Sequence, residues 1–547
     1  MIIVSFIFFL VAFLFISASL AGQGKIIGFK EDLNLFENIF LGFIFLAIFN
    51  TFLHFFFKIS IYSSLMIFSL GLIFFFKKLF VKKSIFSKKN IIFLLILLIL
   101  VPIFISQKYH EDFGYYHLPY ALLLIKEKII FGIANSNAAY VYNSLWLNIY
   151  PSFFLWDSNF DYLTFSSFIL YVIFIFFLIN GILIEKDWKL SKLFAIISVF
   201  YFILKFTRIS EYGVDIPSAI YSNIAILYFI KFFETKNENE KKKLFFLILN
   251  FSIFSLLIKL SSIPIIVLSI VLYFQNFKFL KTSILEIKFS WIYFLVTLFL
   301  IQQFIYTGCV GFPNSFSCFN VSWFNDYFLT LKNILETINK SYGEAKDIMS
   351  SQEYLENFRW FPFWLNRNYF EILNHILTMA LPILIIYFIL RNQNKKYYKL
   401  YKVRLNLTIF VFVSLIFWLS FSPVYRFAIP YFITFVFLIF SVFFDKKIIS
   451  NKIFLSILII CLLFNFSKNI NRIFDKNKIY FGIDKIENKY VKDFENSKPY
   501  MGIFFVDTKN NNANGWQGRL CWDVPIICTN LKIQINKNKN YLFISKF

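Results

Sequence analysis

The sequence predicts an all-α polytopic membrane protein with about fourteen transmembrane helices. Of its 547 residues, 59% are hydrophobic and only 16% are charged, whereas soluble domains carry about 25% charged residues. The apolar residues form continuous blocks of the length that crosses a bilayer, which takes about 20 residues for a helix. Strands of an outer-membrane barrel would instead alternate apolar and polar residues. These observations exclude a soluble enzyme, a disordered scaffold, a secreted disulfide mini-domain and an outer-membrane barrel.

Fourteen apolar blocks mark the expected spans. No Lys or Arg precedes the first block, so we interpret it as a span and not as a cleaved signal peptide. The blocks lie at about 2–20, 35–57, 60–76, 90–106, 162–184, 193–207, 217–233, 244–259, 262–275, 289–306, 372–390, 405–421, 425–444 and 453–467.

The positions of the cations predict the orientation of the spans. Residues 77–90 hold six lysines and no acid, and residues 391–404 hold six Lys or Arg and no acid. Cytoplasmic loops carry an excess of Lys and Arg. Placing the basic loops in the cytoplasm gives a multi-pass protein of the bacterial cytoplasmic (inner) membrane with both termini in the periplasm. The two short blocks within 244–275 must then be separate spans, because merging them would move residues 391–404 outside.

Three segments lie outside the membrane in this topology, all of them periplasmic: the loops 107–161 and 307–371 and the polar tail after residue 467. We therefore divide the chain into an N-terminal three-helix unit (1–89), a transmembrane core (90–467) and a periplasmic C-terminal segment (468–547). The last is expected to be a small appendage or mostly loop.

The cysteines and the net charge add two further expectations. Cys309 and Cys318 share the second outer loop, and Cys521 and Cys528 share the tail, so both pairs lie on the oxidising side and are disulfide candidates, with free thiols as the alternative. The formal net charge of +24 fits the basic cytoplasmic loops. It does not indicate a nucleic-acid partner, because the chain has no basic soluble module with interleaved aromatic residues.

The sharpest polar feature directly follows the fourth predicted span. Residues 107–119 (QKYHEDFGYYHLP) place the adjacent carboxylates Glu111 and Asp112 at the membrane boundary, where ionisable groups that face a bundle interior are functional candidates. Adjacent residues on a helix point about 100° apart, so only one of the two is expected to react, and the sequence does not decide which. The alternative is a polar loop whose aromatic rings anchor in the interface.

Two more outer turns carry charge. Residues 208–217 (RISEYGVDIP) include Asp215, and residues 421–431 (FSPVYRFAIPY) include Arg426 between two apolar spans. A guanidinium group binds phosphate through two parallel hydrogen bonds, which favours Arg426 as a phosphate ligand. The alternatives are an ordinary loop for the first turn and a snorkelling side chain for the second.

An acid, a second acid and an arginine on one outer face resemble the polyprenyl-phosphate-dependent membrane glycosyltransferases of the GT-C fold. Those enzymes carry an acidic catalytic residue in the first large outer loop, which Asp112 or Glu111 matches. Many carry an Arg-aromatic-x-x-Pro turn near a late span, which Arg426 to Pro430 (RFAIP) matches. Three spans precede the acidic loop here, where GT-C enzymes usually have one.

More closely, the chain is similar to an uncharacterised family of bacterial multi-pass membrane proteins related to that superfamily. The matching segments are His54-Phe55-Phe56, Asp112-Phe113-Gly114-Tyr115-Tyr116-His117-Leu118, Gly132-Ile133-Ala134-Asn135, Asn143-Ser144-Leu145-Trp146 and Cys521-Trp522-Asp523-Val524-Pro525.

The resemblance implies transfer of a sugar from a polyprenyl-phosphate donor to a glycan, lipid or protein of the cell envelope. The acceptor hydroxyl needs a base, which we assign to Asp112, and direct attack opposite the leaving group would invert the anomeric centre. Arg426 would stabilise the departing phosphate, with Arg359, Arg367 or His375 assisting. Asp215 would bind acceptor hydroxyls or shift the pKa of Asp112 by repulsion. The remaining candidates for substrate binding are His117, Tyr116 and Trp146.

No cofactor is certain from the sequence. Glu111, Asp112 and Asp215 are oxygen ligands suited to Mg²⁺ or Mn²⁺, but no spacing argues for a metal. Three rival functions stay open: a flippase or transporter of lipid-linked saccharides, a polymerase or ligase that relies on arginines such as Arg359 and Arg367, and a non-catalytic scaffold. The transporter hypothesis has less support, because the sequence shows neither the internal repeat nor the midplane charges typical of that class.

Overall fold

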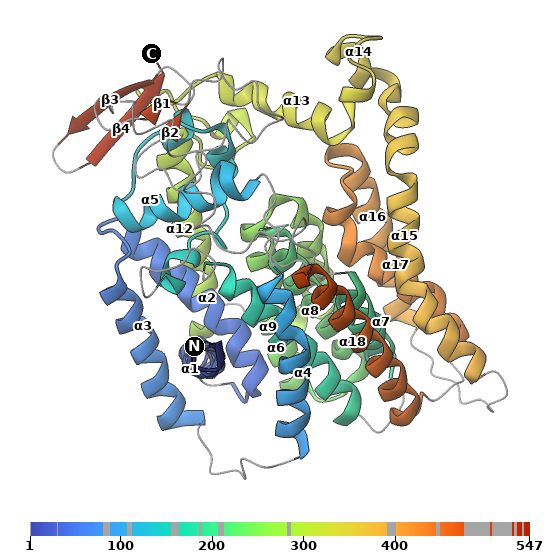
Figure 1. The fold of residues 1–547 in the computed structure, drawn as a ribbon. Helices are drawn as coiled ribbons and strands as arrows, with labels where there is room; N and C mark the ends of the chain where they lie inside the picture. Colours follow the sequence, from blue (N-terminus) through green and yellow to red (C-terminus); the bar gives the residue numbers. More distant parts are fainter. Residues whose placement is uncertain are drawn as a thin grey trace.

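The structure is a computed structural model that describes residues 2–29, 31–79, 88–106, 112–154, 163–184, 189–205, 213–281, 286–390, 401–444 and 449–474, and in the tail 504–505, 528–529, 533–538 and 541–546. The helices of this part of the chain are α1 (Ile2–Ile27), α2 (Leu35–His54), α3 (Ile61–Phe74), α4 (Lys88–Ile105), α5 (Leu118–Lys126), α6 (Phe165–Ile184), α7 (Leu190–Lys205), α8 (Asp215–Glu234), α9 (Glu238–Ile258), α10 (Ile266–Gln275), α11 (Phe277–Leu280), α12 (Ser290–Thr307), α13 (Tyr327–Asn339), α14 (Ser351–Leu355), α15 (Trp360–Ile389), α16 (Tyr401–Phe421), α17 (Ile429–Phe443) and α18 (Asn451–Phe474) (Figure 1). The strands are β1 (Phe504–Phe505), β2 (Cys528–Thr529), β3 (Ile533–Asn538) and β4 (Tyr541–Lys546).

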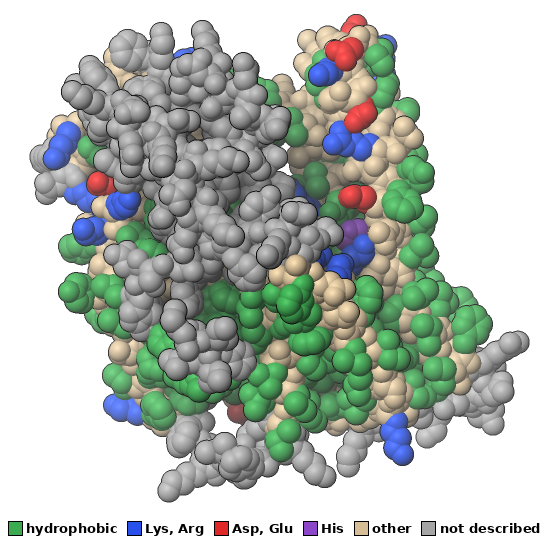
Figure 2. All heavy atoms as spheres, in the orientation of Figure 1, with side chains coloured by type: hydrophobic (Ala, Val, Ile, Leu, Met, Phe, Trp, Pro, Cys, Tyr) green, Lys and Arg blue, Asp and Glu red, His purple; other side chains and the backbone are tan. Residues whose placement is uncertain are grey.

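The fold is a helical bundle of the membrane-embedded kind that the sequence predicts. Within the described residues, ten helices are long and apolar enough to cross a membrane, and two shorter apolar helices lie at 91–105 and 260–275. In the view of Figure 2, hydrophobic side chains cover much of the lower half of the molecule, while acidic side chains gather at the upper right, near α14. The predicted number of fourteen spans goes beyond the ten helices found and stays a prediction.

The chain reverses direction between the two short apolar blocks at 244–275. Helix α9 ends at Ile258, a 3₁₀ turn, η7 (Leu260–Ile265), follows, and α10 begins at Ile266. Ser269 Oγ then lies 3.5 Å from Ser252 Oγ, so α10 runs back along α9. The two blocks therefore form a helical hairpin and not one continuous helix.

Helices α1, α2 and α3 pack closely because small residues lie where they cross. A Cβ atom at Gly42 of α2 would come within 2.0 Å of Leu20 O in α1, and one at Gly71 of α3 within 2.3 Å of Ser19 O. Glycine lets two backbones approach in an apolar environment that provides no hydrophobic drive for association. The hydroxyl of Tyr221 in α8 donates to Phe40 O at 2.9 Å and ties this unit to the rest of the bundle.

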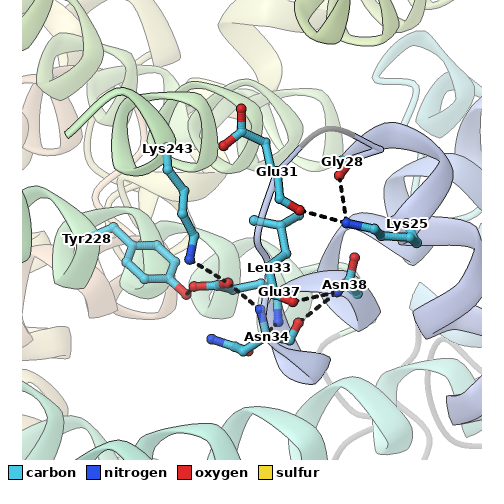
Figure 3. A network of polar contacts seen from close by, with 9 residues as sticks. All are labelled: Lys25, Gly28, Glu31, Leu33, Asn34, Glu37, Asn38, Tyr228 and Lys243. Atoms are coloured by element: carbon cyan, nitrogen blue, oxygen red, sulfur yellow. Dashed lines mark hydrogen bonds and ion pairs between the residues drawn. The ribbon is translucent and has the colours of Figure 1, made fainter. Parts of the chain in front are cut away.

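One end of the bundle is held by a buried polar network between the α1–α2 and α8–α9 turns (Figure 3). The Glu37 carboxylate accepts a hydrogen bond from Tyr228 Oη at 2.9 Å, and Lys243 Nζ lies 3.4 Å from its second oxygen. Lys288, which precedes α12, pairs with Glu31 at 2.8 Å. These turns all belong to the set of loops predicted to be cytoplasmic, and the structure places them together.

The outer loops and the tail meet at the other end, where Figure 1 shows α5, α13 and the strands. Strand β4 pairs with the first outer loop: Phe131 N donates to Leu542 O at 2.9 Å, and Ile544 N donates to Phe131 O at 2.8 Å. Asn135 Nδ2 donates to Ile544 O at 3.0 Å and also to Trp323 O of the second outer loop at 2.9 Å. The three segments predicted to share one side of the membrane are thus packed on one another.

The structure joins Cys309 and Cys318 in a disulfide that closes the start of the second outer loop. Of the second predicted pair, Cys521 lies outside the described residues, and Cys528 begins strand β2. The remaining cysteine, Cys461, is a buried free thiol in α18.

Candidate functional site

A buried carboxylate with two cations forms the centre of the candidate site. Asp215 has a side chain that is only 6% exposed, and Arg426 Nε lies 3.0 Å from its Oδ2. Lys259 Nζ bonds the other oxygen, Oδ1. Both carboxylate oxygens are therefore in contact with a positive charge, an arrangement that offsets the cost of burying the ions.

The three residues come together because each lies where a helix begins or ends. Asp215 is the first residue of α8, at the helix terminus whose dipole stabilises a negative charge. Lys259 directly follows the last residue of α9. Arg426 lies in the 3₁₀ turn η13 (Tyr425–Ala428) that connects α16 to α17.

A small pocket opens to solvent beside these charges, and the space inside it that a water-sized group can occupy is about 10 Å³. That is the space of about one water molecule, so the pocket is a small polar recess and does not enclose a whole lipid-linked sugar. The ammonium group of Lys259 lies 3.5 Å from the centroid of the Phe427 ring, which closes one side. The pocket is lined by Asp215, Ser218, Ala219, Lys259, Ser261, Ser262, Arg426, Phe427 and Pro430.

Asp112, the first described residue of the acidic loop, lies near the same place. Asp112 is partly buried and directly precedes the π-helical turn η2 (Phe113–His117). It lies within electrostatic range of Arg426, Lys259 and Tyr116. Burial, followed by the charges of Asp112 and Asp215, raises the pKa of Tyr116 well above its usual range. The Tyr116 phenol, which is protonated at neutral pH even at its ordinary pKa, therefore stays protonated over a still wider pH range and can serve as a hydrogen-bond donor.

His117 fills the space between the acidic loop and the start of α8. Its ring packs against Gly213, where an added Cβ atom would lie 2.0 Å from His117 Cε1. Gly213 also has a φ of +47°, a left-handed conformation that glycine adopts without strain. The glycine two residues before the start of α8 thus leaves room for the histidine.

A family model described as a domain of unknown function, DUF8201, matches residues 1–433. The chain belongs to this family. Neither a curated protein nor a solved structure matches it. The matched DUF8201 region contains Asp112, Asp215, Lys259 and Arg426, so the whole pocket lies within the family's domain, whereas the hairpin β3–β4 follows it.

Lys259 is the residue of the candidate site that the sequence analysis does not identify. It is the last residue of the apolar block 244–259, where a lone cation resembles a snorkelling side chain. The signal that would have found it is a single charge at the end of an otherwise uncharged span, next to a Ser-Ser-x-Pro turn. Ionisable residues in such positions are functional candidates by default.

Several predicted residues of the DUF8201 chain do not reach the pocket. Trp146 is fully buried, packs on Phe43 with ring centroids 5.2 Å apart and donates to Ser167 Oγ at 3.1 Å. It is a fully buried core residue and does not line the pocket, and the substrate-binding role named for it stays a prediction. Arg359 and Arg367 are exposed at the start of α15 and are not among the residues that line the pocket.

His375 lies beside the turn that carries Arg426 without lining the pocket. Its ring lies 4.5 Å from that of Tyr425, and its Nδ1 is 2.7 Å from Tyr201 Oη. Glu111, the other candidate base, falls outside the described residues.

A divalent metal does not fit the described part of the candidate site. The oxygens of Asp215 are already in contact with Lys259 and Arg426. The described residues contain no group of three or more His, Cys, Asp or Glu side chains that could hold a metal ion. The chemistry of this donor set therefore favours an anion, which two cations attract, over a metal cation.

Proposed function

We propose that this protein is a membrane glycosyltransferase with a GT-C-like core of about fourteen spans. It would transfer a sugar from a polyprenyl-phosphate donor to a glycan, lipid or protein acceptor at the periplasmic face of the bacterial cytoplasmic membrane. The observation that carries the proposal is the pocket where Arg426 and Lys259 flank Asp215, with Asp112 in electrostatic range.

The two cations suit the phosphate of the donor. When the bond between the anomeric carbon and the phosphate oxygen breaks, the leaving group keeps the electron pair and its negative charge grows. Arg426 and Lys259 are held in place before the reaction, so they stabilise this charge without reorganising. Ser261 and Ser262 line the same pocket, and the hydroxyl of Ser262 lies 2.6 Å from that of Ser218.

Asp112 is the proposed base. It would take the proton of the acceptor hydroxyl as the acceptor oxygen attacks the anomeric carbon from the side opposite the phosphate, which inverts that centre. Asp215 receives a different role from the one expected from sequence. Because it contacts both cations, it fixes their positions and is not free to bind acceptor hydroxyls.

The rival functions draw less support from the site. A transporter would be expected to carry its charges near the membrane midplane, whereas Asp215, Lys259 and Arg426 all lie at helix ends. A polymerase or ligase built on Arg359 and Arg367 would need these residues in the pocket. Arg367 instead pairs with Glu344 at 2.8 Å on the surface.

The test of this proposal is Asp112→Asn, compared with Asp326→Asn as a control that removes an exposed acid in the second outer loop. We expect Asp112→Asn to lower glycan transfer in membranes by about 10²–10⁴-fold, the usual contribution of a general base, while binding of a lipid-phosphate donor stays intact. The control should transfer at the normal rate. Retained transfer in Asp112→Asn would rule out Asp112 as the base. Movement of lipid-linked sugar between leaflets without a new glycosidic bond would establish a transporter instead.

A further inference from the structure

Asp215 is surrounded in a way that differs from the acidic residues of metal-dependent sites. A carboxylate that holds Mg²⁺ or Mn²⁺ presents its oxygens to the ion, usually together with other oxygen ligands. Here Lys259 Nζ bonds Oδ1, and Arg426 Nε lies 3.0 Å from Oδ2. The positions that a divalent ion would take on this carboxylate are filled by two side chains of the protein.

The balance of charge at the pocket points the same way. Among the residues that line the cavity, two cations and one carboxylate leave an excess of one positive charge. Asp112, which is not among them, lies within electrostatic range of both cations. Lys259 is 20% exposed and Arg426 23%, so both remain accessible to a small group that enters. In a partly buried environment, the attraction between such a charge and an anion is several times stronger than in water.

We propose that Lys259 takes the place of a divalent cation in this pocket, so that the site binds a phosphate group without metal. The inference rests on the proposed function for the identity of the anion. It assigns to Lys259 and Arg426 together the charge stabilisation that a metal ion supplies in other phosphate sites. Asp215 then acts as a positioning residue that holds the two cations apart and aims them at the cavity.

The first experiment measures binding of dodecyl phosphate to the purified full-length protein in detergent, with EDTA and then with added Mg²⁺. We expect the same affinity in both buffers. Lys259→Met should lower the affinity by about 10- to 100-fold, because a charge in contact with the anion is lost, whereas Lys259→Arg should retain most of it. Lys332→Met, which removes an exposed lysine of α13, is the matched control and should bind normally. Size-exclusion profiles show whether each variant is folded.

Binding that requires Mg²⁺, or equal binding by Lys259→Met and the unmodified protein, would overturn the inference. A second measurement does not depend on phosphate: electron paramagnetic resonance of Mn²⁺ titrated into the unmodified protein and into Asp215→Asn. We expect the spectra of the two proteins to show the same amount of bound Mn²⁺. A bound Mn²⁺ ion that is present in the unmodified protein and lost in Asp215→Asn would also overturn the inference. If dodecyl phosphate binds in neither buffer, the proposed function and the assigned anion fail together, while the Mn²⁺ result still decides whether Asp215 holds a metal.

Discussion

At the scale of single residues, the site depends on side chains that other residues hold in place. Asp215 keeps Lys259 and Arg426 beside the pocket. Gly213, two residues before Asp215, makes room for the ring of His117. Burial and two nearby carboxylates raise the pKa of Tyr116 well above its usual range. The loop after α4 and the start of α8 therefore fit each other through contacts that a single added atom would disturb.

Replacing Gly213 by alanine tests this fit. The added Cβ atom would lie 2.0 Å from His117 Cε1, and the φ of +47° is unfavourable for alanine. We expect a loss of stability of about 1–2 kcal/mol from the backbone conformation alone, with weaker binding of a phosphate probe because the acidic loop must move. Thermal unfolding in detergent measures the first effect and probe affinity the second.

Gly343→Ala is the control for this substitution, since nothing lies within 4 Å of the position that its Cβ atom would take. It should leave both quantities unchanged. If the two variants unfold at the same temperature, the proposed contact between Gly213 and His117 has no energetic consequence.

At the scale of elements, two tryptophans fix the turn that carries Arg426. The indole N–H of Trp364 in α15 donates to Pro423 O at 2.7 Å, and that of Trp418 in α16 donates to Val424 O at 2.8 Å. Their rings meet edge to face with centroids 5.7 Å apart. The start of α15 is thereby coupled to the position of Arg426, although it contributes no residue to the pocket.

Trp364→Phe keeps the aromatic ring but removes the donor to Pro423. A buried carbonyl without its partner costs about 1–3 kcal/mol, so we expect faster hydrogen exchange in residues 422–428 and weaker binding of dodecyl phosphate. Mass spectrometry of the exchanged peptides reports the first change. Trp323→Phe removes a comparable bond, from Trp323 Nε1 to Phe304 O, away from this turn. It should leave hydrogen exchange at residues 422–428 unaltered. Equal exchange in both variants would show that the hydrogen bond from Trp364 does not hold the turn that carries Arg426.

At the scale of the whole molecule, the polar groups divide between two ends of the bundle. Helix α12 begins next to Lys288, which pairs with Glu31, and ends beside the disulfide-closed loop of Cys309 and Cys318. The turns at the first end are rich in lysine, and the second end carries the outer loops and the strands. An orientation with the lysine-rich end in the cytoplasm follows the positive-inside rule.

Cysteine labelling measures this orientation. Phe316 is 97% exposed in the outer loop, and Asn239 is exposed near the start of α9 at the opposite end. We expect Phe316→Cys to react with a membrane-impermeant maleimide in spheroplasts, and Asn239→Cys to react only after permeabilisation. The unmodified chain controls for labelling of its own cysteines. Reaction of both variants from the same side would contradict the arrangement.

The sequence was sufficient to predict the helical blocks and the end of the bundle at which the charged turns lie, because long apolar runs and loop cations are strong signals. The predicted topology places Asp112, Asp215 and Arg426 on the same side of the membrane, which is enough to expect them near one another. It does not predict which of them are in contact. The role of Lys259 could not be predicted, because a single cation at a helix end has the same sequence pattern as a snorkelling lysine. The sequence also could not predict that Trp146 is buried, because an aromatic residue gives the same sequence pattern in a core and in a binding groove.

The pairing of β4 with Phe131 has a consequence for biosynthesis. Residues 541–546 leave the ribosome long after the loop they complete, and Asn137 of that loop donates to Tyr115 O at 3.0 Å, next to the acidic segment. A nascent chain that has already inserted its helices therefore still lacks the last support of its acidic loop. The loop around Phe131 can therefore complete its backbone pairing only after residues 541–546 have been made.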